Sequence, residues 1–330
     1  MDFSDLARLA SGHAEARIIQ VAVSLGAFEA LQDRGRPAPD VAASLQTDPR
    51  ATEFLLNALA ALGLLEKKDG LFFLNDVSSV YLVRGSEKYL GGMILFDSSL
   101  WDCWGALEEA VRSGRPARSP DMFQADPSET ERFIYAMHSL VQARGDAEIL
   151  TEKLDLGGVD ELLDIGSGPG TYPIHFCRKQ LELHATIFDL PGTLEITRKI
   201  VSSSGLSERI SLVAGNYRHD PIPGSYDMIF LCNIIHSESA EENSRLMAKL
   251  YPRLNPGGRI VIKDHILDDK LTHPPVGAIF SMLMLLTTEQ GRCYSFSEVK
   301  GWLEETGFTR VTEMPLPHPL TSSLVIGDKS

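Results

Sequence analysis

Apolar residues recur at helical spacing through the first third of the chain. Over residues 14–25 they fall three and four positions apart, which predicts an amphipathic helix, and Gly26 is placed to end it as a C-cap. Two more helices and a β-hairpin are predicted to follow, over 38–45, over 49–62, and over the paired runs 64–66 and 71–74. Helices followed by such a hairpin predict a winged-helix domain.

A change in composition marks the end of this domain. Trp101, Trp104 and Leu107 form one more helical apolar stripe, which is typical of a core or a subunit interface. Residues 113–120 are rich in proline, serine and glycine, which predicts a linker. We therefore expect a winged-helix domain over residues 1–115 and a second domain over 116–330.

Strand-like and helix-like segments alternate beyond residue 121, which is typical of a doubly wound sheet. A helix over 129–140 comes first. Strands are predicted over 162–165, 185–188, 210–213, 228–232, 259–262, 310–314 and 323–326, with helices that include 240–254 and 297–306. The predicted fold class is α/β, a Rossmann-like doubly wound domain preceded by a mostly helical one.

A glycine-rich turn follows the first of these strands. Gly166, Gly168 and Gly170 allow a sharp turn and a close approach of the backbone to a ligand. A dinucleotide fingerprint would require a glycine at position 171, where Thr171 stands. The spacing favours a cofactor other than a dinucleotide, and an ordinary strand-to-helix turn is the alternative.

Two aspartates accompany this turn. Asp164 would lie beside it, where a carboxylate repels phosphate and attracts an ammonium or sulfonium group. Asp189, at the end of the next strand, is placed to accept both hydroxyls of a ribose. S-adenosylmethionine carries both cations and no phosphate, so the pair favours it, although a nicotinamide enzyme could also use Asp189.

Charge and composition exclude several classes of partner. The formal charge of -14 opposes non-specific attraction to nucleic acid or to anionic lipid. The predicted recognition helix offers Arg50 beside Glu53 and Phe54, which favours packing in a dimer over binding of DNA. No secretory signal and no apolar run of the roughly 20 residues that span a bilayer is visible, so we expect a cytoplasmic protein.

Polar side chains also follow the later strands, at the edge where ligands bind in such sheets. Asn216 and Tyr217 follow the third strand and could contact an adenine, or could simply form a turn. His236 follows the fourth strand, where an imidazole could take a phenolic proton. Asp264, directly after the fifth strand, is placed to steady that imidazole.

The sequence opposes a metal site. The chain has four cysteines, none in a Cys-x-x-Cys pair, and we expect them to be buried thiols. Residues 264–273 hold several carboxylates and imidazoles. Consecutive Asp264 and His265 on an extended segment point to opposite sides, which opposes a common metal centre and favours a solvated loop.

Together these segments resemble the S-adenosylmethionine-dependent O-methyltransferases, a family that includes caffeate, acetylserotonin and polyketide-tailoring enzymes. The resemblance covers nearly the whole chain. Besides the glycine turn it includes the Asp-Leu-Pro after the second strand, His236, and the segments 22–28, 56–65, 133–137 and 302–308. Each pattern is degenerate on its own, and their order along the chain carries the resemblance.

The resemblance implies methyl transfer from S-adenosylmethionine to a hydroxyl of an aromatic small molecule, with S-adenosylhomocysteine as product and no metal. It implies His236 as general base with Asp264 beside it, and a homodimer formed through the amino-terminal domain, with neither nucleic acid nor membrane as partner. The expected cofactor-binding residues are Asp164, Gly166, Gly168, Gly170, Asp189, Leu190, Asn216, Tyr217 and Cys232. The expected acceptor-binding residues are Met137, Phe280 and Met284.

Three positions depart from the family pattern. Asn216 stands where an aspartate is usual, and Ser237-Glu238 follow the base where Asp-Trp is common. Cys293 stands in place of one of two flanking glutamates, and a thiol cannot orient an imidazole as a carboxylate does. Carbon or nitrogen methylation on the same fold therefore stays open, as does a non-catalytic, ligand-sensing dimer.

Overall fold

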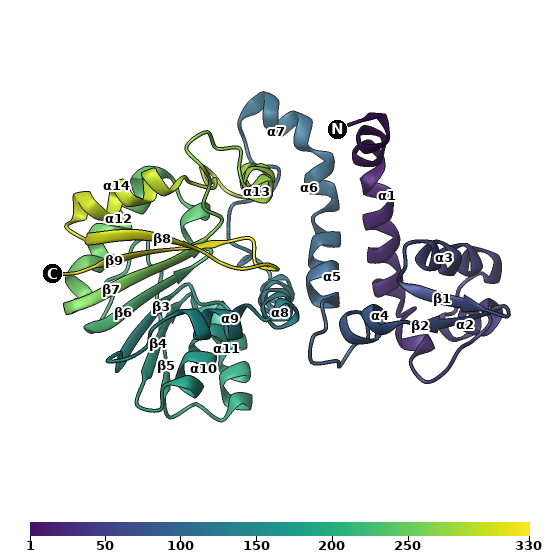
Figure 1. Cartoon of the computed structure of the whole chain (residues 1–330), viewed down its shortest axis with the longest axis horizontal. Helices are drawn as coiled ribbons and strands as arrows, with labels where there is room; N and C mark the ends of the chain where they lie inside the picture. The colour runs from purple at the N-terminus through teal and green to yellow at the C-terminus, as the bar shows by residue number, and fades with distance from the viewer. The chain divides into compact units, whose positions relative to one another are not determined.

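The computed structural model describes residues 1–330 and divides them into two compact units (Figure 1). The first unit consists of Met1–Trp101 and Tyr135–Arg144, and the second of Asp102–Ile134 and Gly145–Ser330. One long helix, α8 (Pro127–Arg144), therefore contributes residues to both units.

The first unit contains the predicted helices and hairpin. Its elements are α1 (Phe3–Leu25), α2 (Ala38–Leu45), α3 (Pro49–Ala61), β1 (Leu65–Lys68), β2 (Leu71–Leu74), α4 (Asp76–Tyr81) and α5 (Gly91–Ser99). α1 begins well before residue 14 because Asp2 and Asp5 form a capping box, and it ends at Gly26 with φ of 78°, as predicted. Phe28, Leu56 and Phe72 are buried at the centre of this unit.

The second unit alternates strands and helices. Its first helices are α6 (Trp101–Gly105) and α7 (Leu107–Ser113), so the helix predicted through this stretch is interrupted at Ala106. Its strands are β3 (Glu161–Ile165), β4 (His184–Asp189), β5 (Ile210–Ala214), β6 (Tyr226–Cys232), β7 (Leu254–Asp264), β8 (Thr309–Pro315) and β9 (Ser323–Asp328). Its further helices are α9 (Asp146–Lys153), α10 (Thr171–Lys179), α11 (Pro191–Ser204), α12 (Ala240–Leu250), α13 (Pro275–Thr287) and α14 (Phe296–Thr306).

The seven strands form one sheet in the order β5-β4-β3-β6-β7-β9-β8. Neighbours from β5 to β7 pair in parallel, and β9 runs antiparallel to both β7 and β8. β3 is the first strand of this sheet along the chain. β4 and β5 follow on one side of it and β6 and β7 on the other, so the strand order reverses between β3 and β6. Ligands of doubly wound sheets bind at such a switch point, beyond the carboxyl ends of the strands.

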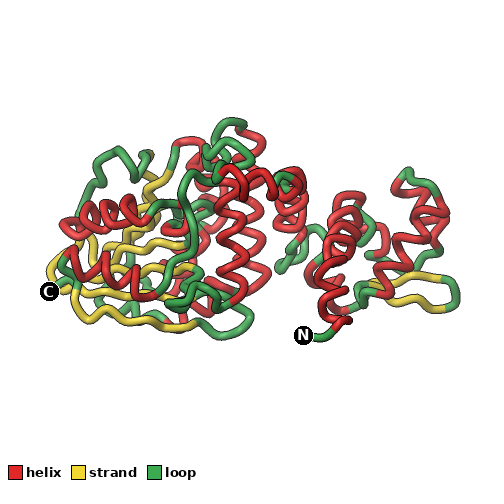
Figure 2. The backbone as a smooth tube through the Cα atoms, turned by 90° about the horizontal axis from the view of Figure 1, so that it is seen from above, coloured by secondary structure: helices red, strands yellow, loops and turns green.

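Helices cover both faces of this sheet, with α12 and α14 on one face and α10 and α11 on the other (Figures 1 and 2). This explains why β3 reads as a continuous apolar run rather than an alternating one. Leu162, Leu163 and Ile165 are each fully buried. The Rossmann-like α/β fold predicted from the sequence is confirmed.

Two further features bear on the sequence predictions. The stretch predicted as a linker is attached to the second unit, because the amide of Ala117 donates to the carbonyl of Leu286 at 2.9 Å. No helix combines the length and the apolar composition that crossing a lipid bilayer requires.

Candidate functional site

The glycine turn after β3 has the backbone conformation that the sequence predicts. Gly166, Gly168 and Gly170 have φ of 62°, 59° and 74°, in the left-handed region that glycine adopts freely. A Cβ on Gly166 would clash with Cδ1 of Ile234, which lies just beyond the end of β6. The turn therefore packs against the segment that leads to His236, and a larger residue at Gly166 requires the side chain of Ile234 to move.

Replacing Gly166 by alanine should lower the free energy of unfolding by about 2 to 3 kcal/mol, since the new Cβ meets Ile234 and the backbone is left-handed. Gly168 is a matched control, because its φ of 59° is similar but the nearest atom to an added Cβ is 3.8 Å away. Its alanine variant should lose only about 1 kcal/mol. Urea denaturation measures both, and equal losses would contradict the packing argument.

The two aspartates lie on either side of this turn. Asp164 is 1% exposed, its Oδ2 accepts from Oγ of Ser167 at 2.7 Å, and its Oδ1 has no hydrogen-bond partner. Burial raises the pKa of Asp164 to about 8. Such a buried carboxyl oxygen without a donor fits a cationic group of a ligand.

Asp189 joins the end of β4 to the glycine turn. Its Oδ2 accepts from the amide of Gly168 at 2.8 Å, and its Oδ1 accepts from the amide of Leu190 at 2.7 Å. Burial raises the pKa of Asp189 to about 6, although these two hydrogen bonds and a third from the side chain of Thr193 act in the opposite direction. The carboxylate keeps accepting capacity beyond these bonds for a ribose hydroxyl.

The loop after β5 places Asn216 and Tyr217 next to this turn. Oδ1 of Asn216 accepts from the amide of Arg218 at 2.9 Å, so the side chain does form the turn that was the alternative prediction. Cε1 of Tyr217 lies 3.9 Å from the position of a Cβ on Gly166. The contact of these residues with an adenine stays a prediction.

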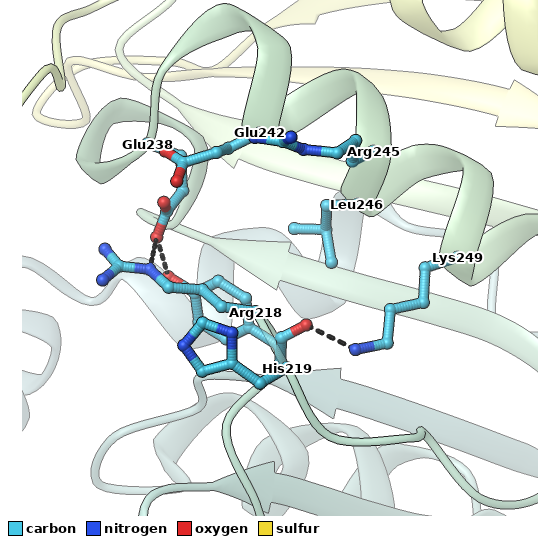
Figure 3. Close-up of a pocket in the computed structure, with 8 residues that line it drawn as sticks. Arg218, His219, Glu238, Glu242, Arg245, Leu246 and Lys249 are labelled. Atoms are coloured by element: carbon cyan, nitrogen blue, oxygen red, sulfur yellow. Dashed lines mark hydrogen bonds and ion pairs between the residues drawn. The ribbon is translucent and has the colours of Figure 1, made fainter.

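A pocket of about 380 Å³ opens beside this loop (Figure 3). It mixes cationic and acidic side chains, and its lining residues are Tyr217, Arg218, His219, Glu238, Glu242, Arg245, Leu246 and Lys249. Asp164, Asp189 and His236 do not line it. Among the lining residues, Tyr217 also lies next to the glycine turn, at Gly166.

His236 and Asp264 are brought together across neighbouring strand ends. Nδ1 of His236 lies 2.8 Å from Oδ1 of Asp264, and both residues are buried. Burial alone would raise the pKa of Asp264, but the adjacent imidazole of His236, by charge and hydrogen bond, holds it below its usual value. The buried carboxylate fixes the orientation of the ring.

Phe280 of α13 lies against this histidine. The two ring centroids are 4.9 Å apart at an interplanar angle of 77°. A Cβ on Gly291 would clash with the carbonyl oxygen of His236, so the segment before Cys293 packs directly on the turn that carries His236. Cys293 is buried, and burial together with the charge of Asp264 raises its thiol pKa to about 12.

Three remaining predicted residues lie in different surroundings. Met284 is buried on α13, four residues beyond Phe280. Cys232 ends β6, and burial raises its pKa to about 12. Met137 lies on the part of α8 that belongs to the first unit and is half-buried there.

A buried ion pair near the strand ends was not anticipated. Nζ of Lys263, the penultimate residue of β7, lies 3.3 Å from Oδ2 of Asp146, and the two side chains are 1% and 0% exposed. The hydroxyl of Tyr172 donates to the same carboxylate oxygen at 3.3 Å. The sequence feature that could have indicated this ion pair is Lys263 itself. It directly follows the apolar run 260–262, and a lysine within a buried strand needs a buried partner.

Glu238 and Asn243 were also missed as site residues. Nδ2 of Asn243, fully buried on α12, donates to the carbonyl of Ile235 at 2.8 Å and so supports the turn of His236. No group of three or more His, Cys, Asp or Glu residues is placed to hold a metal ion.

Known proteins match this chain over nearly its whole length. A model of the O-methyltransferase domain matches residues 104–309, and a model of the O-methyltransferase dimerisation domain matches residues 7–84. The 3-hydroxy-5-methyl-1-naphthoate 3-O-methyltransferase of Streptomyces sahachiroi is 31% identical over 331 residues, 98% of this chain and 95% of the relative. The tetracenomycin polyketide synthesis 8-O-methyl transferase of Streptomyces glaucescens is 29% identical over 98% of this chain and 96% of its own.

A solved structure agrees with these matches. The S-adenosyl-L-methionine-dependent methyl transferase PigF of a Serratia species is 28% identical over 97% of this chain and 94% of its own. The structure of PigF with SAH superposes with a TM-score of 0.90 at 26% identity and covers 100% of both chains. This chain therefore belongs to the O-methyltransferase family and is an S-adenosylmethionine-dependent enzyme that carries the family's dimerisation domain at its amino-terminal end.

Proposed function

We propose that the enzyme methylates a hydroxyl group of an aromatic small molecule and that His236 is its general base. The observation that carries this proposal is the 2.8 Å contact between His236 and Asp264, beside the glycine turn. Carbon or nitrogen methylation is the second candidate, because the same imidazole could take a proton from a phenol that is methylated on its ring or from an amine. The acceptor screen described below distinguishes these outcomes.

The donor would be held by the glycine turn and its two aspartates. When bound, S-adenosylmethionine supplies a methyl group on a positively charged sulfur. Asp164 would face a cationic group of the donor with its free Oδ1, and Asp189 would accept from the ribose. Tyr217 would border the adenine. The close packing at Gly166 allows the backbone to approach the donor without a side chain between them.

The base would act through its second ring nitrogen. Asp264 accepts from Nδ1–H of His236, which leaves Nε2 with a lone pair. Nε2 takes the hydroxyl proton as the acceptor oxygen bonds to the methyl carbon, and Asp264 stabilises the imidazolium that forms. Catalysis then depends mainly on the alignment of the acceptor oxygen with the methyl group.

The acceptor would lie on the apolar side of this base. Phe280 contacts His236, and α13 consists almost wholly of apolar residues between Pro275 and Thr287. Few polar groups there could satisfy a hydrophilic ligand, which supports a flat and mostly hydrophobic acceptor. Met137 and Met284 remain proposed contacts.

A homodimer would form through the first 115 residues. Phe3, Leu6 and Leu9 on α1 are 83%, 57% and 59% exposed in the single chain, and such a stripe favours burial against a second copy. Light scattering of the purified protein tests this, and a monomer at micromolar concentration would contradict it.

A screen of phenolic acceptors tests the proposed reaction. The purified enzyme is incubated with S-adenosylmethionine and a panel of mono- and polycyclic phenols, and products are examined by mass spectrometry for the gain of one methyl group. The carbon chemical shift of the new methyl group distinguishes an ether from a methyl group on a ring carbon. Methylation only at ring carbon or at nitrogen would overturn the proposal.

Donor binding at pH 7 should release up to about one proton. In the free enzyme Asp164, with a pKa of about 8, is mostly protonated at this pH. A cationic ligand favours the charged carboxylate, so binding lowers the pKa and the proton leaves. Calorimetry in two buffers of different ionisation enthalpy measures the release, which should disappear in D164N and above pH 9.5. Net proton uptake would contradict the assignment.

A further inference from the structure

Glu238 is a buried acid that contacts two separate segments, the loop after β5 and the segment before α14. It lies two residues after His236 and is 2% exposed. Its Oε1 accepts from the hydroxyl of Tyr217 at 2.5 Å and from Nε of Arg218 at 2.8 Å. Its main-chain carbonyl accepts from the hydroxyl of Tyr294 at 2.6 Å. Figure 3 shows the carboxylate between Arg218 and the helix α12.

Tyr217 is the partner of Glu238 on the donor side. Its ring lies next to Gly166, at the 3.9 Å described above, and its own carbonyl accepts from Nζ of Lys249 at 2.7 Å. The ring is therefore fixed at its hydroxyl by Glu238 and at its backbone by Lys249. Few rotamers remain for a side chain held at both ends.

On the other side, Glu238 belongs to the turn that carries the base. Its amide donates to the carbonyl of Ile235 at 3.3 Å, which closes the short helix Ile235–Ser237 around His236. The segment before Tyr294 packs on this turn as well, since Gly291 approaches the carbonyl of His236. The main chain of Glu238 is thus part of the turn that holds His236.

The protonation states of Tyr217 and Glu238 suit this arrangement. Burial, with the acidic neighbour Glu238, raises the pKa of Tyr217 well above its usual value, so the phenol stays a donor at all physiological pH. Burial also raises the pKa of Glu238, and the nearby carboxyl of Glu242 adds to this effect, while Tyr217 and Arg218 oppose it. Either form of Glu238 keeps an oxygen that accepts from Tyr217.

We propose that Glu238 is a positioning residue that couples the donor-binding loop at Tyr217 to the turn that carries His236. The inference rests on the proposed function, and it gives a role to Ser237-Glu238, which depart from the family's Asp-Trp. Glu238 does not touch the acceptor or the transferred methyl group. It acts through Tyr217 on the donor and through the main chain on the base.

Two substitutions each remove the hydrogen bond between Tyr217 and Glu238, one by changing the donor and one by changing the acceptor. Tyr217→Phe deletes the hydroxyl and keeps the ring, and Glu238→Ala deletes the carboxylate. Each should raise the Kd for S-adenosylhomocysteine roughly tenfold, the effect expected for one hydrogen bond to a charged group, and lower kcat by a similar factor. Glu238→Gln keeps an accepting oxygen and should recover most of the binding.

A double-mutant cycle separates coupling from independent damage. Y217F/E238A should bind S-adenosylhomocysteine no more weakly than E238A alone, because the two residues act as one unit. Arg245→Ala is the matched control: Arg245 lines the same pocket but pairs with the exposed Glu241 at 3.3 Å, so its removal should change neither Kd nor kcat. Thermal unfolding of each variant reports the folded fraction.

Several results would overturn the proposal. Additive effects of Y217F and E238A, an unchanged Kd in either variant, or a loss of kcat that only follows the folded fraction would each do so. If E238A does not fold, Y217F alone carries the test, because an unchanged Kd for S-adenosylhomocysteine in that variant would overturn the proposal. Binding of S-adenosylhomocysteine is measured without an acceptor. The double-mutant cycle therefore still tests the coupling between Tyr217 and Glu238 even if aromatic hydroxyls prove not to be methylated.

Discussion

Replacing His236 by alanine should lower kcat by roughly two to four decades while the Kd for S-adenosylhomocysteine stays unchanged. The imidazole is the only titratable side chain that Asp264 orients in this way at the end of β6. Without it the acceptor hydroxyl keeps its proton, and a neutral hydroxyl is a poor nucleophile at pH 7. Donor binding is unaffected because the glycine turn and its aspartates are intact.

Steady-state kinetics with the best phenol from the acceptor screen measure this loss. His273→Ala is a suitable control, because His273 lies on a solvent-exposed loop with its side chain 74% exposed. That variant should keep full activity, and it also tests whether the carboxylates and imidazoles around 264–273 contribute chemistry. A loss smaller than tenfold in H236A would favour catalysis by proximity alone or an acceptor other than a hydroxyl.

Lys263→Met should lower the free energy of unfolding by about 3 to 5 kcal/mol, the usual cost of breaking a buried ion pair by removing one of its members. Asp146 is fully buried, and its Oδ2 accepts from both Nζ of Lys263 and the hydroxyl of Tyr172. Methionine fills a similar volume, so the loss is electrostatic rather than a cavity effect.

The double variant K263M/D146N is the control for this interpretation. Asparagine removes the charge and keeps an oxygen that can accept from Tyr172, so stability should recover to within about 1 to 2 kcal/mol of the wild type. Chemical denaturation monitored by circular dichroism gives the four free energies of the cycle. A double variant as unstable as K263M would show that packing, and not the loss of the ion pair, causes the destabilisation.

Local patterns predicted most of the elements. The left-handed glycines at 166, 168 and 170 and the capping glycine at 26 depend only on backbone conformation, which the residue type itself permits. The apolar run of β3 and its neighbours depends on burial on both faces, which a continuous hydrophobic stretch predicts. Element ends were less accurate, as α1 and β7 extend beyond the predicted ranges where caps and strand pairing continue them.

The prediction of the base and its partner followed from chain order combined with a rule of the fold. Parallel strands end at one edge of the sheet, so polar residues that directly follow β6 and β7 must lie near each other. His236 and Asp264 are neighbours for this reason. The two aspartates of the glycine turn favoured the donor, the family resemblance added the expected roles, and the matches to O-methyltransferases confirm the family.

The sequence by itself determined the fold class, the glycine turn and the residues at the strand ends, because each follows from backbone preferences and from apolar periodicity within a short segment. Only the tertiary structure decided which distant side chains pair. Lys263 meets Asp146 across 117 positions, and Tyr217 meets Glu238 across 21. Such pairs depend on strand order, helix placement and burial, which set the local dielectric and the distance between charges, and no local pattern encodes these quantities.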